Sequence, residues 1–287
     1  MHIHWFPGHM TKSLRLIEEN LKTVDAIVYV LDARAPLSCI NESFDKLIDG
    51  KSILFVLNKI DLADKAKVSA WQKYFTEQGK NVIAVTSTEK LSSSVFMNAL
   101  KKIEKPKVSK FEAKGVFIPT RLMVLGVPNS GKSTLINSVC GKKSAITGNK
   151  PGVTRGKQWV RLSNGMELLD TPGTLFPDFK DQQKAQRLAF IGSIRDEVVD
   201  QEELARELAL CLMQLYPKEF MQKYSLTQTD DAEEIMRQIC KKRGFLLRGG
   251  EFDMERCSKG LVDDFRKGKI CPVTLELPNE NTNERAD

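Results

Sequence analysis

The sequence predicts a doubly wound, mainly parallel α/β sheet followed by a smaller, all-helical domain. Strand-like and helix-like segments alternate from the N-terminus to about residue 180. The strand-like segments are near-continuous apolar runs, which are typical of parallel strands covered on both faces by helices. Beyond about residue 181 only helical periodicity remains. We therefore expect a first domain over residues 1–181, a helical domain over 182–277 and a disordered acidic tail over 278–287.

The period of the apolar residues assigns the individual elements. Strands are expected at residues 25–32, 52–58, 81–87 and 120–126, and at KQWVRL and MELLD on either side of the turn at 163–165. Helices are expected around 11–22 and 41–49, and at AWQKYFTEQ, SSVFMNALKKI and STLINSVCG. A lysine-rich segment, 101–114, is expected to be a solvated connector. The helical domain shows its periodicity in QKAQRLAFIGSI, QEELARELALCLMQLY and DDAEEIMRQICKKRGF.

The composition of the 287 residues, 41% hydrophobic and 28% charged, is that of a globular protein. No apolar run approaches the roughly 18 to 20 residues that a membrane-spanning helix needs. The first ten residues, MHIHWFPGHM, resemble neither a secretory signal nor a transit peptide. Six scattered cysteines without a CxxC pair favour free thiols in a reducing compartment. We expect a cytoplasmic monomer with no membrane partner.

The segment GVPNSGKS has the spacing of a phosphate-binding loop between a strand and a helix. Gly126 and Gly131 let the backbone turn closely, so that amide N–H groups and the helix N-terminus face the phosphates. Lys132 supplies positive charge to the β- and γ-phosphate oxygens, and Ser133 offers a hydroxyl to Mg²⁺. The predicted phosphate-binding residues of this loop are Pro128, Asn129, Ser130, Gly131, Lys132, Ser133 and Thr134.

A second motif, LLDTPG, places a carboxylate at the end of an apolar strand. Asp170 is expected to hold Mg²⁺, usually through water, and the Gly173 amide to contact the γ-phosphate. D-x-x-G alone is a weak motif, but its place after a phosphate-binding loop strengthens it. The polar stretch between the two motifs contains Thr154, the preferred candidate for a switch hydroxyl that reaches Mg²⁺ while the γ-phosphate is present. Thr147 is the alternative.

The tetrapeptide NKID follows a predicted strand but precedes the phosphate-binding loop in the chain. An Asp61 carboxylate that accepts hydrogen bonds from guanine N1–H and its exocyclic amine would select guanine over adenine. The stem of Lys59 would pack over the ring, and Asn58 would contact the base edge or tie loops together. Ser87 and Thr88, after the next strand, are candidates for a backbone amide that binds the guanine carbonyl. Parallel sheets bind ligands at the carboxyl ends of their strands, so an inverted motif order leaves one site intact.

With motifs in the order NKID, TST, GVPNSGKS, Thr154 and DTPG, the chain resembles a circularly permuted P-loop GTPase. WFPGHM at residues 5–10, DARAP at 32–36 and PGVTRGKQW at 151–159 are similar to the YlqF/RbgA type of ribosome biogenesis GTPase. The resemblance covers the whole GTPase domain, and a trailing helical domain also fits the family. It implies hydrolysis of Mg²⁺-bound GTP to GDP and phosphate, coupled to late maturation of the large ribosomal subunit through rRNA contacts.

The resemblance also implies how hydrolysis is activated. Members of the family are stimulated by the ribosomal particle and by potassium, and Asn129 stands at the position of the potassium-linked asparagine; a polar loop residue is the alternative. Many GTPases place a water-orienting glutamine after D-x-x-G, whereas this chain has Thr174, Leu175 and Phe176. The family's substitute is the histidine of the N-terminal motif, which is His9; a structural histidine in a turn is the alternative.

Positive charge points to a polyanionic partner. Lys and Arg outnumber Asp and Glu by 44 to 37, a net charge of +7, which favours nucleic acid before membrane. The densest basic segment is KKRGFLLRGG in the predicted helical domain. Clustered cations there would bind the phosphate backbone of RNA with little sequence preference; a solvated basic surface is the alternative. The candidate RNA-binding residues are Lys241, Lys242, Arg243 and Arg248.

Other functions remain open on the sequence alone. A small-molecule kinase would share the phosphate-binding loop but leave NKID and WFPGHM unexplained, and a P-loop GTPase could act on another RNA. A regulator with vestigial nucleotide binding is disfavoured by the intact set of Lys132, Ser133 and Asp170. Asp32 and Arg34 of DARAP also stay open, between a role at the ligand-binding edge and a structural pair.

Overall fold

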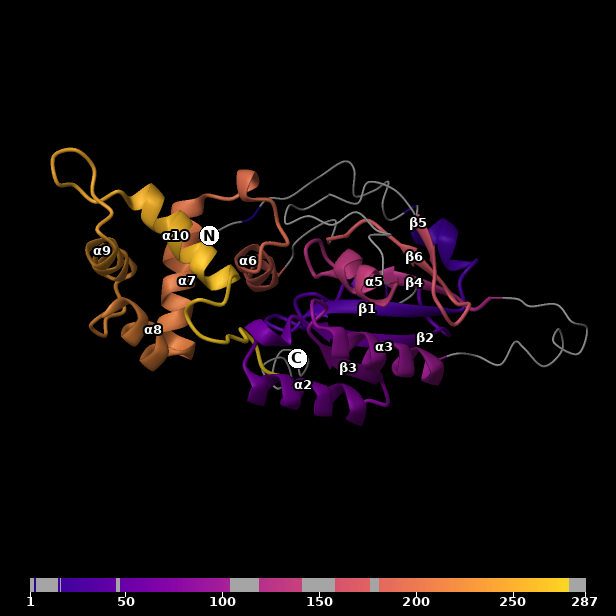
Figure 1. The fold of residues 1–287 in the computed structure, drawn as a ribbon. Coiled ribbons are helices and arrows are strands. Elements are labelled where there is room, and N and C mark those ends of the chain that lie inside the picture. The colour runs from indigo at the N-terminus through magenta and orange to yellow at the C-terminus, as the bar shows by residue number, and fades with distance from the viewer. Residues whose placement is uncertain are drawn as a thin grey trace, which may run out of the picture.

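The computed structural model of the protein describes residues 3, 15, 17–44, 47–103, 119–140, 158–175 and 181–278. It contains a six-stranded sheet flanked by helices, and beside it a group of helices that follows in the chain (Figure 1). We call this group, Gln182–Arg266, the helical module. The predicted fold class, a mainly parallel α/β sheet followed by a helical part, is confirmed.

The sheet has the strand order β3-β2-β1-β4-β6-β5. All neighbouring strands pair in parallel except β5, which runs antiparallel to β6 at one edge. The strand that comes first in the chain, β1, therefore lies in the interior of the sheet beside β4. The strands are β1 Ala26–Asp32, β2 Ser52–Asn58, β3 Asn81–Val85, β4 Arg121–Leu125, β5 Gln158–Arg161 and β6 Glu167–Asp170.

Helices cover both faces of the sheet, as the apolar strands require. Alternate residues of β1 point to opposite faces: Val28 and Val30 pack in one cluster with the helices α3, Lys90–Ile103, and α5, Lys132–Cys140. Tyr29 lies in the second cluster, on the opposite face, with helix α2. Tyr29 and Phe55 stack there with ring centroids 5.7 Å apart. The bounds of α2 are Lys65–Glu77.

Four helices of the module begin at an aspartate whose side chain accepts a backbone N–H of the first turn, which satisfies an otherwise unpaired donor. These caps are Asp181, Asp200, Asp231 and Asp253. The remaining helix, α8, has Pro217 at its first turn, where the missing N–H costs nothing. The helices are α6 Gln182–Phe190, α7 Gln201–Leu215, α8 Pro217–Tyr224, α9 Ala232–Arg243 and α10 Met254–Arg266.

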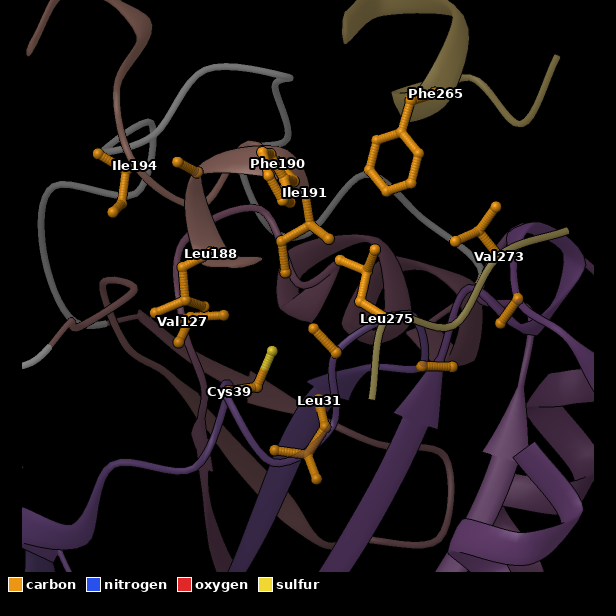
Figure 2. Close-up of a cluster of buried hydrophobic side chains, with 14 of the residues drawn as sticks. Leu31, Cys39, Val127, Leu188, Phe190, Ile191, Ile194, Phe265, Val273 and Leu275 are labelled. Carbon is orange, nitrogen blue, oxygen red and sulfur yellow. The ribbon is translucent and has the colours of Figure 1, made fainter. Parts of the chain in front are cut away.

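The core of the module is continuous with the core on one face of the sheet. Leu188, in α6, and Ile191, in the turn that follows it, belong to the same buried cluster as Leu31 at the end of β1 and Val127 after β4 (Figure 2). Phe265, near the end of α10, belongs to the same cluster, and its ring points toward it (Figure 2). The helical module is therefore packed onto the sheet through apolar side chains.

Two expected elements are shorter than the apolar pattern predicts. Where a helix is expected around residues 41–49, the described residues form a 3-10 turn, η1, over Glu42–Phe44. The amides of Leu47 and Ile48 both donate to the Phe44 carbonyl, but residues 47–50 are not helical. The strand expected over 81–87 ends at Val85 because the following amides leave the ladder for side-chain acceptors.

The first three residues of the connector expected over 101–114 are helical, since α3 continues to Ile103, which is buried; residues 104–114 lie outside the described residues. Helices α8 and α10 were not individually predicted from the sequence. Their apolar faces are narrow: in α10 the buried apolar residues Cys257, Leu261 and Phe265 recur every four positions among charged neighbours. Within the described ranges, no helix is long and apolar enough to cross a membrane. All six cysteines lie in those ranges and are free thiols.

Leu188→Ala is expected to destabilise the fold because Leu188 is fully buried where the module meets the sheet. Removing a buried leucine side chain leaves a cavity and costs about 2 to 5 kcal/mol. Urea denaturation followed by circular dichroism measures the effect. The matched control is Leu91→Ala in α3, because Leu91 is 74% exposed. Equal denaturation midpoints for the two variants would contradict the shared core.

Candidate functional site

Five parallel strands end at one edge of the sheet. Asp32 at the end of β1 is in register with Asn58 at the end of β2, and Asn58 with Val85 at the end of β3. On the other side of β1, Asp170 at the end of β6 is in register with Val124 of β4. The segments that follow these strands therefore meet, although NKID and GVPNSGKS are far apart and in inverted order in the sequence. The parallel register accommodates that inversion.

The loop after β4 is shaped by two glycines. Gly126 has φ 148° and Gly131 φ 94°, conformations that favour glycine. A Cβ atom at Gly126 would lie 2.3 Å from the carbonyl oxygen of Val30, and one at Gly131 would lie 2.2 Å from Nδ2 of Asn58. No other residue fits at either position without movement of the backbone or of Asn58. Helix α5 starts at Lys132, so its N-terminus faces the same edge.

Lys132 turns back over the loop that precedes it. Its ammonium group donates to the carbonyl oxygens of Gly126 at 3.1 Å and Val127 at 2.9 Å. The side chain is buried, and this burial lowers its pKa to about 8, against an opposing attraction from Asp170. A Cβ atom at Gly173 would lie 3.0 Å from the Lys132 nitrogen, which places the DTPG segment directly beside this amine.

Ser133 and Asp170 form a pair of oxygen ligands. The Ser133 hydroxyl donates to Oδ2 of Asp170 at 2.9 Å. The other oxygen, Oδ1, is buried and has no hydrogen-bond partner among the described residues. Burial raises the pKa of Asp170, while Ser133 and Lys132 lower it. A buried acceptor without a partner suits a cation or a water held there, and carboxylate and hydroxyl oxygens are the ligands that Mg²⁺ prefers.

Asn58 joins three loops. Its Nδ2 donates to the carbonyl oxygen of Ser130 in the loop after β4, at 2.8 Å. Its Oδ1 accepts from the backbone amide of Ser87 at 3.1 Å and from the Ser87 hydroxyl at 2.7 Å. The side chain is 1% exposed. Of the two roles left open for Asn58 by the sequence, the geometry supports the tying of loops, because both ends of its amide are engaged.

Residues 58–64 follow β2 and carry the predicted base-binding residues, so we call them the base-binding loop. Apart from Asn58, the residues of this motif lie nearer the surface. Lys59 has φ 62°, and its ammonium lies 2.9 Å from Oδ2 of Asp32. Asp61 is exposed in the 3-10 turn η2, Ile60–Leu62. Thr88, after β3, is also exposed. The loop therefore presents the Asp61 carboxylate to solvent at the edge where the strands end.

Asp32 and Arg34 are a buried structural pair. Arg34 donates from Nε to Oδ1 of Asp32 at 2.9 Å and from a terminal nitrogen to Oδ2 at 2.8 Å. Although burial raises it, the Arg34 guanidinium and the Lys59 ammonium hold the pKa of Asp32 well below its usual range. Arg34 also reaches the helical module, at the carbonyl oxygens of Ile191, 3.5 Å away, and Arg266, 3.4 Å away.

A turn of the helical module contacts the phosphate-binding loop, and no motif in the sequence indicated it. Nδ2 of Asn129 donates to the carbonyl oxygen of Gly192 at 2.7 Å. The Ser193 hydroxyl donates to the carbonyl oxygen of Pro128 at 2.8 Å. Both contacts join residues far apart in the chain, which is why short-range patterns could not reveal them.

The four candidate RNA-binding residues are not equivalent. Lys241, Lys242 and Arg248 are exposed, at the end of α9 and in the loop after it. Arg243 instead forms an ion pair with Asp264 and lies over the ring of Tyr224, 5.6 Å from its centroid. All four side chains are exposed, and Arg243 differs from the other three because its charge is already paired with Asp264. The candidates His9, Thr154 and Thr147 lie outside the described residues.

The chain matches the family described as 50S ribosome-binding GTPase over residues 121–244, beginning at the first residue of β4. It is 39% identical to ribosome biogenesis GTPase A of Bacillus cereus, over 98% of this chain and 95% of that protein. The protein of the same name from Thermotoga maritima is 31% identical, over 97% and 95% of the two chains.

A solved structure, GNP-bound YlqF from T. maritima, superimposes with a TM-score of 0.68. It is 28% identical and is matched over 93% of this chain and 99% of that one. The similarity therefore spans both the sheet and the helical module. Because relatives this similar match over nearly their whole length, and because the phosphate and base motifs meet at one edge of a circularly permuted sheet, the chain belongs to the ribosome biogenesis GTPase A family.

Proposed function

We propose that the carboxyl edge of this sheet binds Mg²⁺-GTP and hydrolyses it to GDP and phosphate during maturation of the large ribosomal subunit. The observation that carries this proposal is the Asn58 amide, which ties the base-binding loop to the phosphate-binding loop through Ser130. A kinase site would need no base-binding carboxylate beside Asn58. The names of the relatives, ribosome biogenesis GTPase A, support the same conclusion.

The phosphate end of the nucleotide lies over the loop of residues 128–134 in this proposal. The amides of the loop and the N-terminus of α5 would face the phosphate oxygens. The Lys132 ammonium, which here bonds to the carbonyl oxygens of Gly126 and Val127, would turn to the β- and γ-phosphates. Ser133 and Asp170 would hold Mg²⁺, and Thr154 would complete the set when the γ-phosphate is present. Magnesium supplies positive charge that neutralises the β- and γ-phosphate oxygens. The Gly173 amide contacts the γ-phosphate.

The base end lies over the base-binding loop. Asp61 accepts hydrogen bonds from guanine N1–H and from the exocyclic amine, and the stem of Lys59 covers the ring. Lys59 is suited to this because its ammonium is fixed on Asp32. The segment Ser87–Thr88 supplies the amide for the guanine carbonyl. The Ser87 amide already donates to Asn58, so Thr88 is the better candidate of the two.

Hydrolysis needs a group that orients the attacking water. Leu175 is buried after the D-x-x-G motif and carries no polar side-chain atom, so we assign this role to His9, whose imidazole can polarise water near neutral pH. We further propose that potassium stimulates turnover through the side-chain oxygen of Asn129. The chain has no water-orienting glutamine after the D-x-x-G motif. We therefore propose that the ribosomal particle raises the rate of hydrolysis at this site.

The helical module is the proposed rRNA-binding part. We divide the chain into a GTPase domain over residues 1–181, an RNA-binding domain over 182–277 and a tail. Lys241, Lys242 and Arg248 are exposed together and would contact RNA phosphates. We propose that the protein acts as a monomer in the cytoplasm, where its free thiols persist.

Asp61→Asn is expected to exchange guanine preference for xanthine preference. An amide cannot accept both hydrogen bonds from guanine, but it can donate to the 2-oxo group of xanthine. Competition of GDP and XDP against a fluorescent nucleotide measures the exchange. Asp49→Asn in the turn before β2 is the matched control and should keep the wild-type preference. Retained guanine preference in the Asp61 variant would remove this residue from base recognition.

Ser133→Ala is expected to weaken the effect of Mg²⁺ on bound nucleotide, because it removes the hydroxyl beside Asp170. The effect is the dissociation rate of fluorescent GDP in EDTA divided by its rate in Mg²⁺. The wild-type ratio should be large and that of the variant close to one. Ser138→Ala in the same helix is the control, since its hydroxyl donates within α5 to Leu135. An unchanged ratio in the Ser133 variant would exclude it as a ligand.

GTP turnover should rise when purified large ribosomal subunits are added and should not rise with small subunits. The triple variant Lys241→Glu, Lys242→Glu, Arg248→Glu should lose this stimulation, because reversed charges repel RNA phosphates. Lys73→Glu in α2 is the control, since Lys73 is also exposed but lies outside the module. Stimulation that survives the triple variant would place the RNA contact elsewhere, and stimulation by neither subunit would favour another RNA.

A further inference from the structure

The chain returns from the helical module to the sheet after α10. We call residues 271–277 the C-terminal strap. It has no regular secondary structure, yet Val273, Thr274, Leu275 and Glu276 are each at most 2% exposed. Val273 and Leu275 lie between the module and the ends of the strands (Figure 2). A short segment that is buried to this extent is an integral part of the folded core.

The strap is hydrogen-bonded to the base-binding loop. The Val273 amide donates to the carbonyl oxygen of Leu62 at 3.0 Å. The Thr274 hydroxyl accepts from the Asp64 amide at 3.2 Å and donates to the carbonyl oxygen of Ala33, also at 3.2 Å. Leu62 directly follows Asp61 in the chain. The backbone on the C-terminal side of the base-binding carboxylate is thus held by the strap.

Tyr216 of the helical module joins the same group of hydrogen bonds. Its hydroxyl accepts from the Thr274 amide at 2.9 Å and lies 3.1 Å from the Thr274 carbonyl oxygen. It also lies 3.3 Å from Oδ2 of Asp64. Asp64 caps helix α2 with its other carboxylate oxygen. One phenol therefore links the module, the strap and the end of the base-binding loop.

Glu276 anchors the end of the strap. Its carboxylate accepts from the Ser38 amide at 3.0 Å and from the Ser38 hydroxyl at 2.8 Å. Arg187 of α6 lies 3.1 Å from the same carboxylate. The indole N–H of Trp71 in α2 donates to the Glu276 carbonyl oxygen at 3.1 Å. These bonds fix the strap along its length, so it cannot slide past the base-binding loop without breaking them.

The N-terminal side of the base-binding loop is held in a second way. Lys59 is bound to Asp32, and Asp32 is bound to Arg34. Arg34 in turn reaches backbone carbonyl oxygens of the helical module at Ile191 and Arg266. Both sides of the short turn that carries Asp61 are therefore fixed by groups connected to the module, while the Asp61 side chain itself is exposed.

We propose that the C-terminal strap positions the base-binding loop, and that Thr274 and Tyr216 are positioning residues that prolong the lifetime of bound guanine nucleotide. They act through the backbone of Leu62 and Asp64, which sets where the Asp61 carboxylate lies. The helical module thereby influences the base end of the site as well as the phosphate end. This inference rests on the proposed assignment of Asp61 as the guanine-binding carboxylate.

Thr274→Val, in the strap, and Tyr216→Phe, in the helical module, each remove hydrogen bonds of the same group. Valine keeps the shape of threonine but cannot bond to Asp64 or Ala33, and phenylalanine keeps the ring of Tyr216 without its hydroxyl. We expect fluorescent GDP to dissociate about tenfold faster from either variant, because hydrogen bonds that hold the loop are lost. Stopped-flow displacement measures these rates.

IDP supplies the readout that a general loss of stability would not change. IDP lacks the exocyclic amine and so makes one hydrogen bond fewer to Asp61. Displacement of the Asp61 carboxylate therefore weakens IDP binding less than GDP binding. The ratio of IDP to GDP dissociation rates should fall toward one in both variants. Thr227→Val is the control, since Thr227 is an exposed threonine of the module that bonds only to Gln238 in the described structure, and its ratio should equal that of the wild type.

The outcomes separate this inference from the assignment on which it rests. If Asp61→Asn changes to xanthine preference while both strap variants keep the wild-type IDP-to-GDP ratio, the strap proposal is wrong and the base assignment stands. If Asp61→Asn keeps guanine preference, the base assignment fails and the strap proposal fails with it. If Thr274→Val does not fold, the ratio measured for Tyr216→Phe decides.

Discussion

The hydrogen bonds at the two ends of the Asn58 side-chain amide hold three loops together as one site. Its nitrogen holds the phosphate-binding loop and its oxygen holds the segment after β3. A buried amide with both ends satisfied is rigid, since any rotation would leave a polar atom unpaired. The permuted order of the motifs is tolerated because this bond depends on the register of strands at one edge, which chain order does not alter.

Charge at this edge is distributed in two separate groups. Asp32 is buried between Arg34 and Lys59 and stays ionised. Lys132 and Asp170 are also buried, but each has a pKa shifted toward its neutral form. The first group is satisfied within the fold and gives it structure. In the second group, Oδ1 of Asp170 has no hydrogen-bond partner among the described residues. Phosphates would stabilise the charge of Lys132, and a divalent cation would stabilise that of Asp170.

Local patterns predicted the loops that meet at the carboxyl edge of the sheet, and contacts between distant residues account for what they missed. GVPNSGKS and LLDTPG were assigned because glycine, lysine and carboxylate spacing is confined to a few residues. The strands were assigned because they are continuously apolar. The Asp32–Arg34 pair could not be resolved from sequence, because its role depends on carbonyl groups of the module more than 150 residues away. The Gly192–Ser193 turn and the strap carry no motif, since their backbone and hydroxyl contacts place few demands on residue type.

The strand order also has a consequence for the synthesis of the chain. Strand β1 lies between β2 and β4, yet β4 is made only after about ninety further residues. Until then, a sheet of the first three strands ends at β1, whose seven residues are all buried in the finished protein. An apolar edge strand with unpaired backbone groups is a template for aggregation. The nascent chain therefore needs protection at β1 during this interval, which ends when β4 pairs with β1.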